Sequence, residues 1–121
     1  MRLFHKLALP LACLGLAITG HAHATDSAAR AIVGNTVHGV EDDGEFYDYY
    51  APNGSATSKL VSGDVTHGRW SIQNGNMCIS FPGDTPACYR VELKGGNLDM
   101  TDVSTGATFH NHLIRGNPQH L

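Results

Sequence analysis

Two cysteines placed symmetrically about a turn constrain this 121-residue chain more than any other feature. Cys78 and Cys88 are equally far from Gly83, which lies in the turn-forming sequence PGDTP. On both sides of this turn apolar and polar residues alternate, which is the pattern of a β-strand. Folding one arm onto the other brings the two cysteines opposite each other, so we predict a β-hairpin with a cross-strand disulfide.

The apolar residues of the two arms define the face of the hairpin that we expect to meet the core. They are Met77, Ile79, Phe81, Tyr89, Val91 and Leu93. Because side chains alternate along a strand, both cysteines fall on the opposite face. We therefore expect the disulfide to clamp two neighbouring strands from outside the core, in a structural role.

Residues 1–24 have the layout of a secretory signal peptide. Arg2 and Lys6 precede an uncharged apolar run, and Ala22-His23-Ala24 is a small-residue cleavage site. The apolar run is shorter than the roughly 20 residues that a transmembrane helix needs. A rival interpretation is a lipoprotein cleavage box ending at Cys13. Signal cleavage predicts a periplasmic or secreted protein, with no membrane insertion afterwards and in a compartment where disulfides persist.

Loss of the signal peptide changes the composition of the chain. The remaining 97 residues keep two cysteines and have six basic against eleven acidic residues, a net charge of −5 with neutral histidines. A nucleic-acid-binding protein needs a basic face for phosphates, and an anionic membrane surface likewise attracts basic segments. The charge balance therefore argues against both kinds of partner.

Short strand patterns alternate with turn signals along the rest of the chain. The expected strands are 36–40, 46–50, 56–61, 65–73, the two hairpin arms, 98–102 and 107–115. Short connections make neighbouring strands antiparallel. We predict an all-β fold of about eight short antiparallel strands in an up-and-down barrel or a strongly curved sheet. The expected divisions are a signal peptide (1–24), a short N-terminal helix or linker (25–35), the barrel-like domain (36–115) and a flexible tail (116–121).

Several short motifs, taken in order, resemble a group of small exported bacterial proteins known mainly as domains of unknown function. The motifs are Gly34-Asn35-Thr36, Tyr49-Tyr50-Ala51-Pro52-Asn53-Gly54, Gly68-Arg69-Trp70-Ser71-Ile72, and Cys78 followed by Cys88-Tyr89. The resemblance implies a periplasmic or secreted β-barrel-like module and brings no catalytic residues with it. In size, export signal and single disulfide the chain is also similar to small periplasmic barrel inhibitors of proteases or lysozyme.

Aromatic residues are the best candidates for contacting a ligand or a partner. Phe46 and Tyr50 share one face of their strand, and Tyr47 and Tyr49 share the other. If the first face is core, the second is exposed and can anchor a protein partner. Trp70 and Tyr89 are the further candidates for a cavity lining. An interior filled by side chains is the favoured expectation for a barrel of this size, with a cavity for one small ligand as the alternative.

Metal binding has weak support in the sequence. His110 and His112 are two apart on an expected strand and so share a face, where His67 or His38 could join them. A solvent-facing pair is the favoured interpretation because no cysteine or clustered glutamate accompanies them. The acidic residues 41–43 lack the EF-hand pattern, so we expect a solvated turn there.

The sequence contains no nucleophile elbow, phosphate-binding glycine loop or zinc-protease motif. We therefore expect a non-enzymatic exported binding module without a cofactor. Protein binding is the favoured function, in the manner of an inhibitor. The alternative is a lipocalin-like barrel that binds a small apolar ligand.

Overall fold

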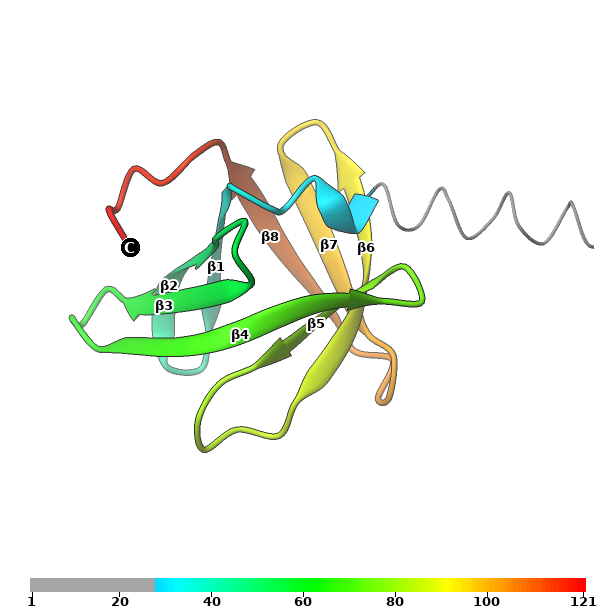
Figure 1. Cartoon of the computed structure of the whole chain (residues 1–121), viewed down its shortest axis with the longest axis horizontal. Coiled ribbons are helices and arrows are strands. Elements are labelled where there is room, and N and C mark those ends of the chain that lie inside the picture. The colour runs from blue at the N-terminus through cyan, green and yellow to red at the C-terminus, as the bar shows by residue number, and fades with distance from the viewer. Residues whose placement is uncertain (1–27) are drawn as a thin grey trace, which may run out of the picture.

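The structure is a computed structural model that describes residues 28–121, so the predicted signal peptide lies outside the described part. Within that part the chain forms eight strands: β1 (Thr36–Glu41), β2 (Gly44–Tyr50), β3 (Ser55–Leu60), β4 (Val65–Gln73), β5 (Asn76–Ser80), β6 (Ala87–Lys94), β7 (Asn97–Asp102) and β8 (Thr108–Ile114). Each strand pairs antiparallel with the next, and β1 also pairs with β8, so the sheet closes (Figure 1). The predicted all-β class is confirmed, and of its two forms the barrel is correct.

The alternation of side chains divides the interior from the surface as the sequence predicted. On β2, Phe46 and Tyr50 are buried, whereas Tyr47 and Tyr49 lie on the outer face. On the β5–β6 hairpin, Met77 and the inward residues of β6 join the same hydrophobic core. Each strand therefore contributes alternate residues to one interior, which is the arrangement that a closed barrel requires.

The chain before β1 closes one end of the barrel. The amides of Ala31, Ile32 and Val33 donate to carbonyls three residues earlier, so this segment forms tight helical turns. Ala29 and Ile32 are fully buried and belong to the core. Figure 1 shows the turns at the end of the barrel where the β2–β3, β4–β5 and β6–β7 connections gather. The beginning of the expected N-terminal helix lies outside the described residues.

Residues next to the barrel reinforce its closing seam. The Thr36 hydroxyl donates to the Gly116 carbonyl over 2.7 Å, and the Gly116 amide donates to the Asn35 side chain over 2.9 Å. In the expected tail, the amide of Leu121 donates to Asn117 Oδ1 and its carbonyl accepts from Asn117 Nδ2. The segment after β8 is thus bonded to the start of β1 and to itself.

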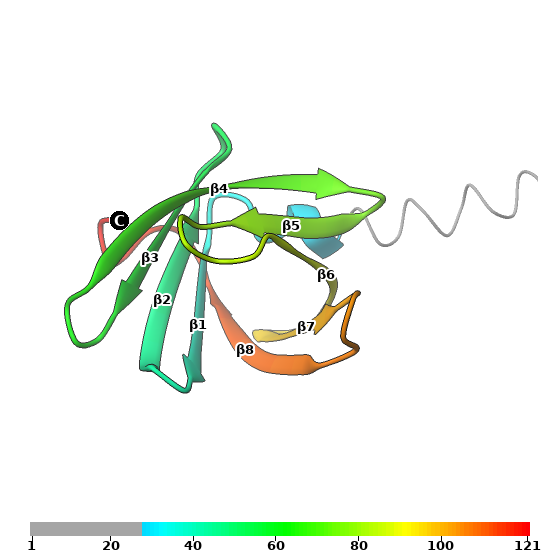
Figure 2. The same cartoon turned by 90° about the horizontal axis from the view of Figure 1, so that it is seen from below.

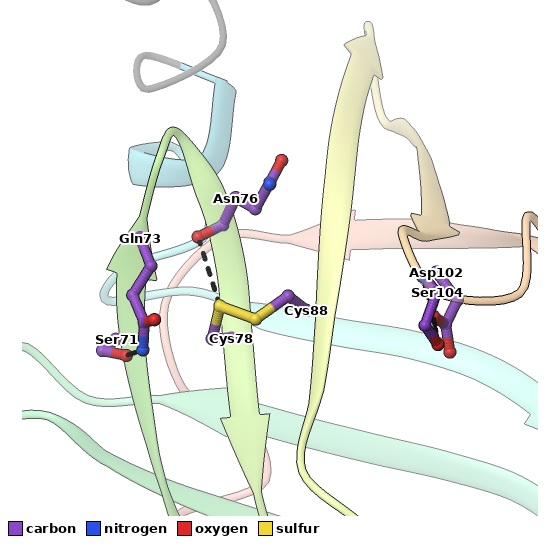
Figure 3. Close-up of a disulfide and its surroundings, with 7 residues drawn as sticks. All are labelled: Ser71, Gln73, Asn76, Cys78, Cys88, Asp102 and Ser104. Carbon is purple, nitrogen blue, oxygen red and sulfur yellow. Dashed lines mark hydrogen bonds between the residues drawn. A yellow bond between two sulfur atoms is a disulfide. The ribbon is translucent and has the colours of Figure 1, made fainter.

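The predicted disulfide joins Cys78 of β5 to Cys88 of β6, with an S–S distance of 2.04 Å (Figure 3). The two residues are directly paired in the antiparallel register. Met77, next to Cys78, belongs to the core, and Tyr89, next to Cys88, packs against it, so the disulfide lies on the opposite, outer face of the hairpin, although Cys78 is itself buried. The hairpin and its cross-strand clamp are therefore confirmed.

Figure 2, turned by 90°, shows how β4 and β5 run along one side of the barrel.

Replacing both Cys78 and Cys88 by alanine should lower the free energy of unfolding by about 3 kcal/mol, because the disulfide closes a short loop in the unfolded chain. Urea unfolding of the oxidised protein and of the double variant measures the difference. Ser71, which is exposed opposite Cys78 on β4, gives the control Ser71→Ala, which should change stability little. Equal stability of wild type and double variant would contradict a structural role.

Gly68 should tolerate no side chain, because a Cβ atom there would clash with the backbone carbonyl of Ser80 and lie 2.6 Å from the Phe81 ring. Gly68→Ala is expected to destabilise the barrel by about 1–3 kcal/mol, the usual range for overpacking. Gly96 has open space around it, so Gly96→Ala is the matched control and should be neutral or slightly stabilising. Thermal unfolding compares the two; similar melting temperatures would refute the close approach of β4 to Phe81.

Candidate functional site

The barrel interior is filled at one end and hollow at the other. A cavity of about 380 Å³ opens at the end opposite the N-terminal turns. Small side chains, those of Ser58, Thr66 and Ala87, line it where larger ones would fill the space. The expectation of an interior filled by side chains is therefore wrong for this half of the barrel. In the other half, the N-terminal turns and the large core residues fill the interior. The volume falls within the range of small-molecule sites.

Aromatic rings form much of the apolar wall of this cavity. They are Phe46, Tyr50, Phe81, Tyr89 and Phe109. Tyr89 and Phe109 meet edge to face, with their ring centroids 6.2 Å apart. Phe109 remains 40% exposed although it lies on the inward face of β8, because the barrel is open there. A ligand entering the barrel would therefore contact aromatic surface.

Five acidic residues line the same cavity: Glu41, Asp43, Asp48, Asp64 and Asp84. Among the described residues that line it, none is a lysine, an arginine or a histidine. Asp43, Asp64 and Asp84 come from the β1–β2, β3–β4 and β5–β6 connections. Alternate connections of an up-and-down barrel lie at the same end, which is why these three residues meet at one opening although they are far apart in sequence. The site is a cavity with aromatic walls and an excess of negative charge.

Asp48 lies deepest among these carboxylates, between the inward side chains of Phe46 and Tyr50 on β2. Its Oδ1 atom is buried and accepts no hydrogen bond, while Oδ2 accepts a long one of 3.5 Å from the Tyr50 hydroxyl. Burial raises the pKa of Asp48 to about 6, and the charge of Glu41 adds to the rise. The nearby hydroxyls of Ser58 and Tyr50 oppose it. Asp48 is thus a buried carboxyl group with unused hydrogen-bonding capacity.

The acidic environment also affects the neighbouring groups. Burial raises the pKa of Glu41, and the charges of Asp43, Asp42 and Asp84 raise it further. Burial also raises the pKa of Tyr89. A cluster of like charges at the barrel opening favours any partner that brings positive charge.

The predicted binding residues fall in three different places. Tyr89 lines the cavity. Trp70 lies at the closed end, where its indole Nε1 donates to the Ala51 carbonyl over 2.8 Å, and it does not line the cavity. Tyr47 and Tyr49 are half-buried on the outer face of β2. The structure therefore does not bring these four residues together.

The histidines of the outer face do not gather at one point. His110 is hydrogen bonded to Asp99, with 2.7 Å between Nδ1 and Oδ1, and His112 lies beside His38, with ring centroids 6.4 Å apart. His38 also stacks on Tyr47 at 4.6 Å. His67 contacts Thr57 instead. Within residues 28–121, no three His, Cys, Asp or Glu side chains are arranged to hold a metal ion.

The sequence interpretation missed the acidic lining of the cavity. One signal could have revealed Asp48, since it alternates with Phe46 and Tyr50 and so shares their inward face. A second signal could have revealed the aspartates of the opening, because the first, third and fifth connections of an up-and-down barrel share one end. The alternation that applies to β2 also applies to β8. There it places Phe109, Asn111 and Leu113 on the inward face, and Asn111 is the buried polar residue among them.

Comparison with known proteins identifies no relative: no family model, curated protein or solved structure matches this chain. The resemblance to small exported bacterial proteins therefore stays a prediction, as do signal cleavage and export. Among residues 28–121 the structure contains no helix with the length and hydrophobicity needed to cross a bilayer.

Replacing Asp48 by asparagine should stabilise the protein more at neutral than at acidic pH. The pKa of about 6 lies above 3.8, the ordinary value for an aspartate, so the folded state binds the proton more tightly than the unfolded state. Wild-type stability should therefore fall as pH rises between these values, by about 3 kcal/mol in total, and level off above pH 6. Asp48→Asn should lose this slope.

Urea unfolding between pH 2.5 and pH 7.5 measures the slope. Asp102→Asn is the control of opposite sign, because hydrogen bonds from Ser104 lower the pKa of Asp102. Its carboxylate stabilises the fold above the unfolded pKa, and that contribution is lost as the pH falls. Identical pH profiles for wild type and Asp48→Asn would contradict the burial of Asp48.

Proposed function

We propose that this chain is a non-enzymatic binding module that holds a small molecule in the open half of its barrel. The observation that carries the proposal is the cavity of about 380 Å³ with one closed and one open end. Cavities that bind small ligands are concave, mostly apolar and supplied with a few convergent polar groups. Here aromatic rings provide the apolar wall, and the carboxyl groups make the lining richer in polar surface than such cavities usually are.

Three further features support ligand binding inside the barrel. The strands that form the wall are joined all round the barrel, so the cavity is built on a rigid frame. The disulfide clamps β5 to β6, and both strands contribute to the lining through Ile79 and Tyr89. Phe109 is a large apolar side chain left partly exposed at the opening, where a ligand would cover it.

Protein binding, which the sequence favoured, would use the outer face of β2. Tyr47 is available there and contacts His38 and Glu45. Alanine in place of both Tyr47 and Tyr49 should abolish capture of a partner from a periplasmic extract if this surface binds one. We place this function second because the structure does not bring the four predicted binding residues together on one surface.

A cavity-filling substitution tests the proposed function. N-phenyl-1-naphthylamine, an uncharged fluorescent probe, should bind the wild-type protein with increased emission. Ala87→Phe places a ring into the cavity and should weaken the binding by about tenfold or more. Arg90→Phe adds the same ring to the exposed outer face of β6 and should leave the affinity unchanged.

Circular dichroism of both variants establishes that the barrel is intact. Equal probe binding by wild type and a folded Ala87→Phe variant would contradict a ligand site in the barrel. Native mass spectrometry of protein purified from its own cells extends the test, because a retained small molecule should be lost from the same variant.

A further inference from the structure

We propose that the cavity selects a small organic cation, an amine with an apolar or aromatic body, and pairs its ammonium group with the Asp48 carboxylate. This inference rests on the proposed function and deepens it by naming the chemical class of the ligand. It is carried by the geometry of the cavity, the distribution of charge around it and the hydrogen bonds that Asp48 does not make.

The charge distribution favours a cation over a neutral or anionic ligand. All five charged residues of the lining are acidic, and they approach the cavity from β1, β2 and three connections. A concave site lined by charges of one sign, with walls of low dielectric constant, concentrates ligands of the opposite sign. A carboxylate or phosphate ligand would meet repulsion on every side.

Asp48 offers a specific position for the positive group. Its Oδ1 atom is shielded and without a hydrogen bond, and the bond from Tyr50 to Oδ2 is long. Leaving a buried acceptor unpaired costs free energy, and more when the acceptor is charged. An ammonium group carries three donors and can satisfy this carboxylate with a charge-assisted hydrogen bond.

The aromatic walls suit the same ligand. The rings of Phe46 and Tyr50 flank Asp48 along β2, and Tyr89 and Phe109 meet nearer the opening. The face of an aromatic ring attracts a cation, and its apolar surface also packs against a hydrocarbon body. An amine with an aromatic or aliphatic body can thus use both parts of the lining.

A metal ion fits the lining less well than an organic cation. Calcium requires six to eight oxygen ligands at about 2.3–2.6 Å, so several carboxylates must converge on one point. In the described part of the chain, no three acidic or histidine side chains are grouped in this way. The carboxylates are instead spread around a volume large enough for an organic molecule.

The test uses three ligands that share a phenyl body and differ in the polar end: 2-phenylethylamine, 2-phenylethanol and 3-phenylpropionate. Amide-resolved NMR titrations at pH 7.5 measure each dissociation constant. We expect the amine to bind about tenfold or more tightly than the alcohol, and the carboxylate to bind weakest. Shifts should centre on residues that line the cavity.

Asp48→Asn should remove the preference for the amine while the uncharged probe N-phenyl-1-naphthylamine still binds. Glu92→Gln removes a carboxylate from the exposed outer face of β6 and is the matched control, with the preference retained. If Asp48→Asn does not fold, Glu41→Gln at the opening should weaken amine binding several-fold without affecting the alcohol.

The outcomes separate this inference from the function on which it rests. Equal binding of amine and alcohol, or a preference that survives in Asp48→Asn, would overturn the inference while probe binding keeps the proposed function intact. Failure of both the amine and the uncharged probe to bind would overturn the proposed function as well. Saturable binding of calcium chloride at the same residues, tighter than that of the amine, would also reject an organic cation.

Discussion

Pairing of β1 with β8 is the interaction on which the rest of the structure depends. It joins the two ends of the sheet through a register of only three residue pairs, beginning with Thr36 opposite Ile114. The Thr36 hydroxyl and the Asn35 side chain extend this seam by binding Gly116. Closure removes the open sheet edges and creates an interior from what would otherwise be one face of a curved sheet. The residues that line the candidate site are enclosed because the sheet closes in this way.

Closure also makes the two ends of the barrel unlike each other. Ala29 and Ile32 enter one end and complete the core, whereas the opposite end retains a cavity lined by small, aromatic and acidic side chains. Asp48 lies between these regions, beneath the opening and above Tyr50. A carboxyl group in this place is costly for stability and is difficult to explain as packing alone. The proposed binding of a positively charged ligand accounts for this loss of stability. The ligand provides the opposite charge and the hydrogen-bond donor that the folded chain does not provide to Asp48.

The sequence predicted the fold well because its main signals are local. Alternation along each strand and glycine-rich turns between strands identified all eight strands, and the spacing of Cys78 and Cys88 identified their disulfide. The site was harder to predict from the sequence, because it depends on how turns that are far apart in the sequence meet in the folded barrel. Trp70 was expected in the cavity, yet a hydrogen bond to Ala51 holds it at the closed end. In the sequence, Asp43 and Asp84 look like ordinary turn residues. Only the closed barrel brings their connections to the same opening.

The titration of the Asp48 side chain tests the central claim most directly. Carbon-13 NMR of its carboxyl group across pH 3–8 reports the protonation of this one residue in the folded protein. The account predicts a midpoint at pH about 6, since the carboxyl group is buried beside Glu41 inside a closed barrel. A midpoint near pH 4, the ordinary value for an aspartate in water, would contradict a buried carboxylate and with it the site described for this barrel.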